Sequence, residues 1–152
     1  MDEIVARSIA KWPNVPAVYG WLELDRRGNW LIKGSRIGNP ALREFIGRNY
    51  AADERGCWFF QNGPQRVYVS LAYTPFVVHH EGDALLDQCG QPFSSSKVYQ
   101  DDEGSVLIEG GRGIALLDDR DLERYAAEGE RLPRIVRAEV ARRFGYVPDP
   151  SK

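Results

Sequence analysis

The feature that most constrains the fold is the tetrad Asp-x-x-Gly, which occurs four times in 152 residues. Asp at the first position accepts a hydrogen bond from a backbone amide two residues on, and Gly at the fourth adopts a positive φ without strain. The tetrad is therefore typical of a type I turn. The copies are Asp25-x-x-Gly28, Asp53-x-x-Gly56, Asp87-x-x-Gly90 and Asp101-x-x-Gly104. Three of them lead into apolar runs, namely Trp30-Leu31-Ile32, Trp58-Phe59-Phe60 and Val106-Leu107-Ile108.

Apolar periodicity between these turns predicts an α+β fold. No βαβ alternation with full-length crossovers is visible, which favours antiparallel β-hairpins packed with three to four helices over a parallel α/β fold. Strands are expected at 18–24, 29–33, 57–61, 67–71, 76–80, 84–86, 106–108 and 114–117. Helices are expected at 4–12, after the Asn39-Pro40 start signal, after Asp118 or Asp119, and after Pro133.

The recurrence of turn and strand at 25–34, 53–63 and 102–111 indicates two related motifs. We expect an N-terminal motif at 1–80 and a C-terminal motif at 81–152, joined in one compact unit. A chain of this length can bury roughly 70% of its unfolded surface, so neither a disulfide nor a metal is needed to complete the core.

Composition excludes several classes of function. The net charge of −2 gives no general attraction for nucleic acid or an acidic membrane. Cys57 and Cys89 lack metal-ligand spacing, so we expect free thiols in a reducing cytosol. The N-terminus lacks the apolar core of a signal peptide, and no apolar run approaches the roughly 20 residues that span a bilayer. The sequence therefore predicts a cytoplasmic protein without a cofactor or a metal.

Residues 25–80 carry a pattern of turn glycines and buried apolar positions. It consists of Asp25-x-x-Gly28-x-Trp30, Gly34-x-x-Ile37, Leu42, Phe45, Asp53-x-x-Gly56, Val67-x-Val69 and Pro75-Phe76-Val77-Val78. The pattern resembles a family of uncharacterised bacterial proteins known only as a domain of unknown function. The resemblance implies two related α+β motifs and a signalling or regulatory role. It implies no catalytic residue, because the matched positions are architectural.

A candidate ligand site lies where aromatic strands flank a polar run at 61–66. Strands that are apolar on both faces must be covered on both, and the expected helices cover one. The other face is then a groove for a small polar ligand, a surface for a protein partner, or a contact between copies of the chain. The expected ligand-binding residues are Trp58, Gln61, Asn62, Gln65, Arg66 and Tyr68. A solvated hairpin tip is the alternative interpretation of the polar run.

Two further hypotheses stay open. His79 or His80 could act as a general base beside an acidic turn, although neighbouring strand residues point to opposite faces. The last expected helix could bind nucleic acid through Arg131, Arg134 and Arg142 near one face, with Arg137 and Arg143 adding charge, although salt bridges to the acidic surplus explain the same residues. The cluster Asp101-Asp102-Glu103 lacks calcium-loop spacing and is interpreted as a turn. The leading hypothesis is a non-enzymatic binding module with a regulatory role.

Overall fold

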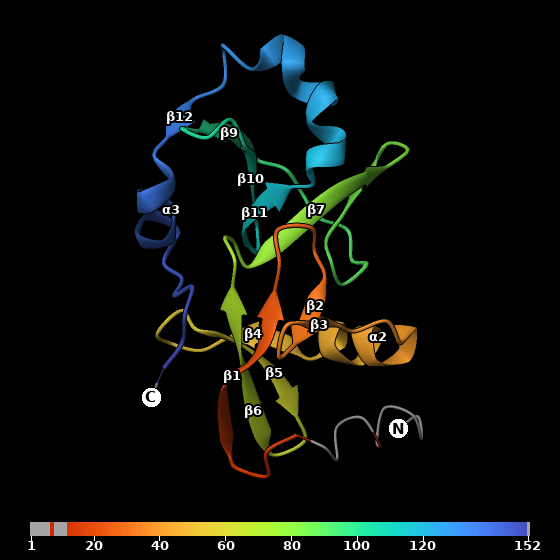
Figure 1. The fold of residues 1–152 in the computed structure, drawn as a ribbon. Coiled ribbons are helices and arrows are strands. Elements are labelled where there is room, and N and C mark those ends of the chain that lie inside the picture. The colour runs from red at the N-terminus through yellow and green to blue at the C-terminus, as the bar shows by residue number, and fades with distance from the viewer. Residues whose placement is uncertain (1–6, 8–11, 152) are drawn as a thin grey trace.

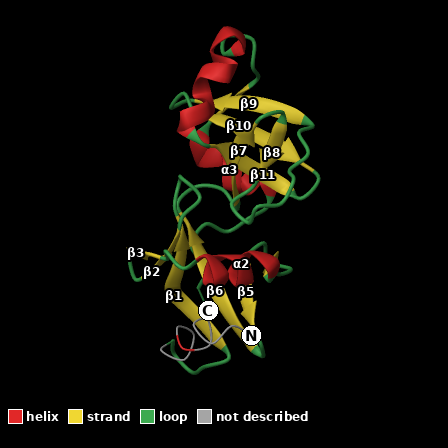
Figure 2. Ribbon diagram, turned by 90° about the vertical axis from the view of Figure 1, so that its right-hand side faces the viewer, coloured by secondary structure: helices red, strands yellow, loops and turns green. Residues whose placement is uncertain are grey.

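The computed structural model describes residue 7 and residues 12–151, so the helix expected at 4–12 lies almost wholly outside the described residues. The described chain forms two six-stranded sheets at opposite ends of the molecule (Figures 1 and 2). The α+β prediction is confirmed only in its coarse form, because strands outnumber helices and the sheets carry most of the fold.

The first sheet is built by residues 17–71 and has the order β3-β2-β1-β6-β5-β4. Helix α2 (Pro40–Arg48) connects β3 to β4 and runs beside the sheet (Figure 2). The start signal is confirmed, since the Asn39 side chain accepts a hydrogen bond from the Leu42 amide and Pro40 begins the helix. The strands are β1 (Ala17–Leu24), β2 (Trp30–Ile32), β3 (Ser35–Arg36), β4 (Tyr50–Ala52), β5 (Trp58–Asn62) and β6 (Gln65–Leu71).

The second sheet has the order β12-β9-β10-β11-β7-β8. The 3₁₀ helix η1 (Asp119–Glu128) follows β11, and its start is capped by the Asp118 side chain, which accepts a hydrogen bond from the Arg120 amide. Helix α3 (Arg137–Phe144) follows β12. The strands are β7 (Phe76–Glu81), β8 (Ala84–Leu86), β9 (Lys97–Asp101), β10 (Val106–Gly110), β11 (Gly113–Leu117) and β12 (Arg134–Ile135).

The two sheets share one strand plan. The first strand of each, β1 or β7, pairs antiparallel with the strand that follows it. It also pairs in parallel with the last strand of a three-stranded meander, which is β4-β5-β6 in one sheet and β9-β10-β11 in the other. The second plan begins at Phe76, before the expected boundary. The division at residue 80 stays a prediction.

Two expectations are corrected by this topology. The sheets are mixed, because β1 pairs in parallel with β6 and β7 with β11. The connection from β1 to β6 runs through four other strands and α2, and that from β7 to β11 runs through three other strands, so no simple βαβ unit marks either pair in the sequence. The last helix begins at Arg137 and not after Pro133, because Arg134 and Ile135 form β12 against β9 and the Pro133 carbonyl accepts the Gln100 amide.

One hydrophobic core joins the sheets. It contains Trp30, Phe60 and Val67 from the first sheet together with Tyr99 and Leu107 from the second. The C-terminal segment then returns to the first sheet (Figure 1), where the Val147 amide donates to the Gly56 carbonyl at 2.9 Å and the Leu71 amide donates to the Pro148 carbonyl at 2.7 Å.

Candidate functional site

The four tetrads form the same turn four times, as the sequence predicted. In the copy at residue 101, Asp101 Oδ1 accepts the amides of Glu103 at 2.9 Å and Ser105 at 2.8 Å, and the Gly104 amide donates to the Asp101 carbonyl. The other three copies repeat these bonds. The glycines have φ values of +82°, +84°, +78° and +86° in chain order. In each tetrad the turn therefore uses one carboxylate oxygen of the Asp and the positive φ of the Gly. The second oxygen, Oδ2, stays free for side-chain contacts, and the side chains of the two middle residues are not needed to form the turn.

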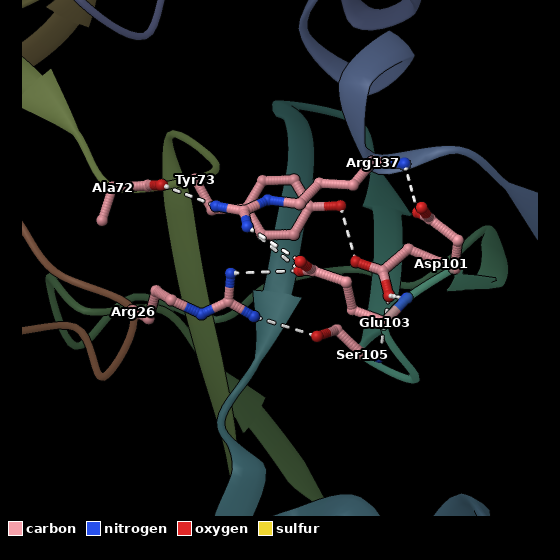
Figure 3. Close-up of polar contacts among 8 residues, drawn as sticks. Arg26, Ala72, Tyr73, Asp101, Glu103, Ser105 and Arg137 are labelled. Atoms are coloured by element: carbon pink, nitrogen blue, oxygen red, sulfur yellow. Dashed lines mark hydrogen bonds and ion pairs between the residues drawn. The ribbon is translucent and has the colours of Figure 1, made fainter.

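The turn at 25 in the first motif meets the turn at 101 in the second. Arg26 Nη2 donates to Ser105 Oγ at 2.9 Å, and its Nη1 lies 4.0 Å from Glu103 Oε1. Arg137, at the start of α3, donates through Nη1 to both Glu103 carboxylate oxygens at 3.1 Å. Glu103 thus lies between two guanidinium groups that come from different ends of the chain (Figure 3).

Tyr73, in the connection between β6 and β7, fixes the same junction. The guanidinium carbons of Arg26 and Arg137 lie 5.1 and 4.8 Å from the centroid of its ring, within the range of cation–π attraction. Its hydroxyl donates to Asp101 Oδ2 at 2.8 Å (Figure 3). Burial, and then this bond to the Asp101 carboxylate, raise the pKa of Tyr73 well above its usual value. The phenol therefore stays protonated and acts as a fixed donor.

Two cavities flank this group, and Glu103 lines both. Their volumes of about 350 Å³ and 500 Å³ lie within the range of small-molecule sites. The smaller is lined by Arg26, Arg27, Glu103, Gly104, Ser105, Leu116, Leu117, Asp119 and Leu122. The larger is lined by Ala72, Tyr73, Asp102, Glu103, Arg137, Ala138, Ala141, Tyr146 and Pro148.

The six residues predicted to bind a ligand do not converge on one cavity. The register of β5 on β6 pairs Gln61 with Arg66 and Phe59 with Tyr68. Alternation along the strands then puts Gln61, Arg66 and Tyr68 on the outer face of the first sheet. Trp58 belongs to the opposite face, where its ring lies 4.8 Å from Tyr50 and 5.0 Å from Phe76.

The amide side chains of the polar run are occupied within the hairpin. Gln61 Nε2 donates to the Gly63 and Gln65 carbonyls, and Asn62 Nδ2 donates to Gln65 Oε1 at 3.1 Å. Gln65 Nε2 in turn holds the incoming chain through the carbonyls of Pro13 and Val15. These contacts build a hairpin tip, and a role for these residues in binding stays a prediction.

The outer face nevertheless carries an aromatic cluster. Tyr68 stacks on Tyr19 with centroids 4.7 Å apart and planes 3° from parallel, and the Arg66 guanidinium lies 4.3 Å from the Phe59 centroid. The Tyr68 hydroxyl donates to Asp53 Oδ2 at 3.0 Å. Burial alone would raise the pKa of Asp53, but the amides of Cys57 and Arg55 and the Tyr68 hydroxyl outweigh burial and lower it. Asp53 is therefore a charged anchor for the turn.

The histidines and cysteines lie apart from the junction. His79 Nε2 is 3.3 Å from Glu81 Oε1, whereas His80 Nε2 is 3.0 Å from the Tyr125 hydroxyl on η1, and neither lines the two junction cavities. Cys57 and Cys89 are free thiols, and burial, followed by the nearby Asp87, raises the pKa of Cys89 to about 12. Within residues 12–151 no cluster of three His, Cys, Asp or Glu side chains could hold a metal ion.

The arginine-bearing helix expected near the C-terminus is confirmed over Arg137–Phe144, but its expected start is wrong, and nucleic-acid binding stays a prediction. Arg134 lies in β12 and Arg131 precedes it, so these residues and Arg142 do not share a helix face. The backbone at 133–135 is taken by the edge of the second sheet, which displaces the helix start to Arg137. Among the helices that the structure describes, none has the length and apolar character needed to cross a bilayer.

Sequence reasoning missed the residues at the junction. One signal was present: the middle positions of two tetrads carry opposite charges, Arg26-Arg27 in one and Asp102-Glu103 in the other. Once the turns are recognised as architecture, such complementary pairs are natural contacts between two motifs. Tyr73 carried no comparable signal, because it is an isolated residue in its segment. Arg137 was visible only as one of several arginines near the C-terminus, which did not point to the junction.

Comparison with known proteins gives a family and a fold. A family model described as "Protein of unknown function (DUF2946)" matches residues 1–151. A DUF1285 family protein from Silicibacter pomeroyi DSS-3 superposes with a TM-score of 0.57 at 17% identity, covering 84% of each chain. Another, from Shewanella baltica OS155, gives a TM-score of 0.54 at 14% identity, covering 70% of this chain and 91% of that one. No curated protein matches. At these identities the two structures show a shared fold alone.

Proposed function

This chain belongs to the family of unknown function whose model spans it, and we propose that it is a cytoplasmic, non-enzymatic module that binds a small polar ligand at the junction of its two motifs. The observation that carries the proposal is the convergence of Arg26, Glu103 and Arg137, from three separate segments, between two cavities. Small-molecule sites typically combine an apolar wall with a few converging polar groups.

The junction is organised for binding before a ligand arrives. Tyr73 is held by Asp101, and both guanidinium groups rest on its ring. The charged groups are still accessible, since the side chains of Arg26 and Arg137 are each 39% exposed and that of Glu103 is 47% exposed. Groups already held in place lose little conformational entropy on binding, which favours affinity.

The position of the junction also supports a regulatory role. A ligand in the smaller cavity would contact the turn at 25 in the first motif and the turn at 101 in the second. A ligand in the larger cavity would contact the turn at 101, the connection between β6 and β7, and α3. Any difference in its affinity for two arrangements of the motifs would shift their populations. Such a ligand-dependent shift is the mechanism that we propose for the regulatory role implied by the family resemblance.

A thermal-shift panel of metabolites tests the proposal. A ligand at a hundred times its Kd adds about 2.7 kcal/mol to the stability of the folded state, which corresponds to a rise in Tm of roughly 5–10 °C for a domain of this size. Glu103→Gln should change the affinity of such a ligand at least tenfold, because Glu103 lines both cavities. The exposed Glu130→Gln is the matched control. The proposal would be contradicted if no metabolite raised the Tm, or if the rise in Tm were the same in Glu103→Gln as in the wild type.

The outer face of the first sheet supports a second candidate, the binding of a protein partner or of another copy of the chain. The stacked Tyr19–Tyr68 pair and the Arg66–Phe59 contact form a cluster separate from the main core. Phe59 and Tyr68 are buried, so Tyr19 and Arg66 are the members of the cluster that a partner can reach. Aromatic residues and arginine are the residues that most often anchor protein interfaces. Light scattering of the wild type and of Tyr19→Ala tests this, and a wild type that is monomeric at every concentration would exclude self-association.

A further inference from the structure

We propose that the 350 Å³ cavity binds a free α-amino acid with an aliphatic side chain, an inference that rests on the proposed function. Three properties of the lining carry it: the mixture of charges, the availability of Arg27, and the leucines beside them. The inference concerns this cavity alone and assigns no ligand to the larger one.

The lining contains both signs of charge in equal number. Arg26 and Arg27 contribute two cations, and Glu103 and Asp119 contribute two carboxylates. A ligand with a single charge would be attracted by the two side chains of opposite charge and repelled by the two of its own charge. This repulsion lowers its affinity for the cavity. A zwitterion satisfies both sides, because its carboxylate faces the arginines and its ammonium faces the carboxylates.

Arg27 supplies the binding group for the ligand carboxylate. Its neighbour Arg26 is already held by Ser105 and Glu103. The Arg27 side chain is exposed, and among the described residues its guanidinium has no hydrogen-bond or ion-pair partner, since only its backbone amide is used by the turn. A guanidinium with free donors binds a carboxylate through two parallel hydrogen bonds.

The remaining lining favours an aliphatic side chain. Leu116, Leu117 and Leu122 complete the lining. Leu116 and Leu117 are buried neighbours on β11 that pack into different core clusters, so the half-buried Leu122 offers the apolar contact to a ligand. The volume lies at the lower end of the roughly 300–1,000 Å³ of small-molecule sites, which fits a ligand of amino-acid size. The charge pattern and the volume thus point to the same class of ligand.

Isothermal titration of the full chain with L-leucine tests the inference, with two analogues that each lack one charge. These are 3-methylbutylamine, without the carboxylate, and 4-methylpentanoate, without the ammonium. We expect leucine to bind and each analogue to bind at least tenfold more weakly. Analogues that bind as tightly as leucine, or no binding by any of the twenty amino acids, would overturn the inference.

Two variants measure separately how the carboxylate and the ammonium of the ligand contribute to binding. Arg27→Ala should lower the affinity for leucine at least tenfold and leave the weak affinity for 3-methylbutylamine unchanged. Asp119→Asn should lower the affinity for leucine and leave the affinity for 4-methylpentanoate unchanged. Arg48→Ala, an exposed arginine at the end of α2, is the matched control and should bind leucine as the wild type does. Leucine binding that is indifferent to both site variants would overturn the inference.

The inference and the proposed function fail differently. The inference would be overturned, and the proposed function would stand, if the protein bound no amino acid but bound a singly charged metabolite whose affinity changes in Glu103→Gln. A protein that ignores the entire panel would overturn both.

Discussion

At the scale of the residue, the Asp-x-x-Gly tetrad divides its four positions between two tasks. Asp and Gly hold the backbone, and the same hydrogen bonds recur in all four copies. The middle residues are free to differ, and in the copies at 25 and 101 they bring opposite charges to the junction. The second and third positions of the repeated turn can therefore carry functional side chains without any change in the fold.

The glycines of two copies should differ in their tolerance of alanine. Gly104→Ala should cost about 1–2 kcal/mol, because the left-handed conformation disfavours a β-carbon and nothing else lies within 4 Å of one there. At Gly56 the added β-carbon would overlap the Gly145 carbonyl oxygen, and such overpacking adds about 1–3 kcal/mol. Urea unfolding of both variants measures the difference, and equal losses would contradict the close approach of Gly145 to this turn.

At the scale of the element, the sequence predicts the elements that depend on local signals, but it does not predict the pairing of strands that are distant in the chain. The hairpins β5-β6 and β10-β11 and the start of α2 follow from Asn39, Pro40 and the turn glycines. The parallel pairs and β12 depend on partners far away in sequence, which no local pattern records. Pro133 resembles a helix start, whereas α3 begins after Val136 without a side-chain cap.

The candidate site was predictable to a smaller extent. The polar run at 61–66 has a local composition typical of ligand contacts, but its amides are consumed by the hairpin. The junction is assembled by tertiary structure, because Arg26, Glu103 and Arg137 meet only when the two sheets pack and β12 places the start of α3. Their chemistry is visible in the sequence, whereas their proximity is not.

The C-terminal segment illustrates the same limit and gives a prediction. Its prolines and polar residues are typical of a frayed end, yet Tyr146 is buried and Leu71 donates to the Pro148 carbonyl. Truncation after Gly145 should cost about 3 kcal/mol or more, as removal of a buried aromatic side chain does. Truncation after Pro150 is the control. Urea midpoints measure both, and similar midpoints would contradict the docking of this segment.

At the scale of the whole molecule, two motifs with one strand plan share one large hydrophobic cluster that contains residues of both sheets, beside smaller clusters within each motif. We therefore expect one cooperative unfolding transition. The four tryptophans, at 12, 21, 30 and 58, all belong to the first half, so their fluorescence follows the first motif and the contact of Trp58 with Phe76. Far-ultraviolet circular dichroism follows both sheets. The two urea curves should coincide. Separate transitions would show that the motifs unfold independently and would contradict a shared core.

The most direct test of the central claim, that the junction of the motifs is a binding site, is a titration followed by amide chemical shifts. The tightest ligand from the metabolite panel is added to ¹⁵N-labelled protein. The account predicts that the perturbed amides cluster at residues 26–28, 72–73, 102–105 and 137–138. Perturbations confined to 58–68 on the first sheet, with the junction amides unmoved, would contradict it.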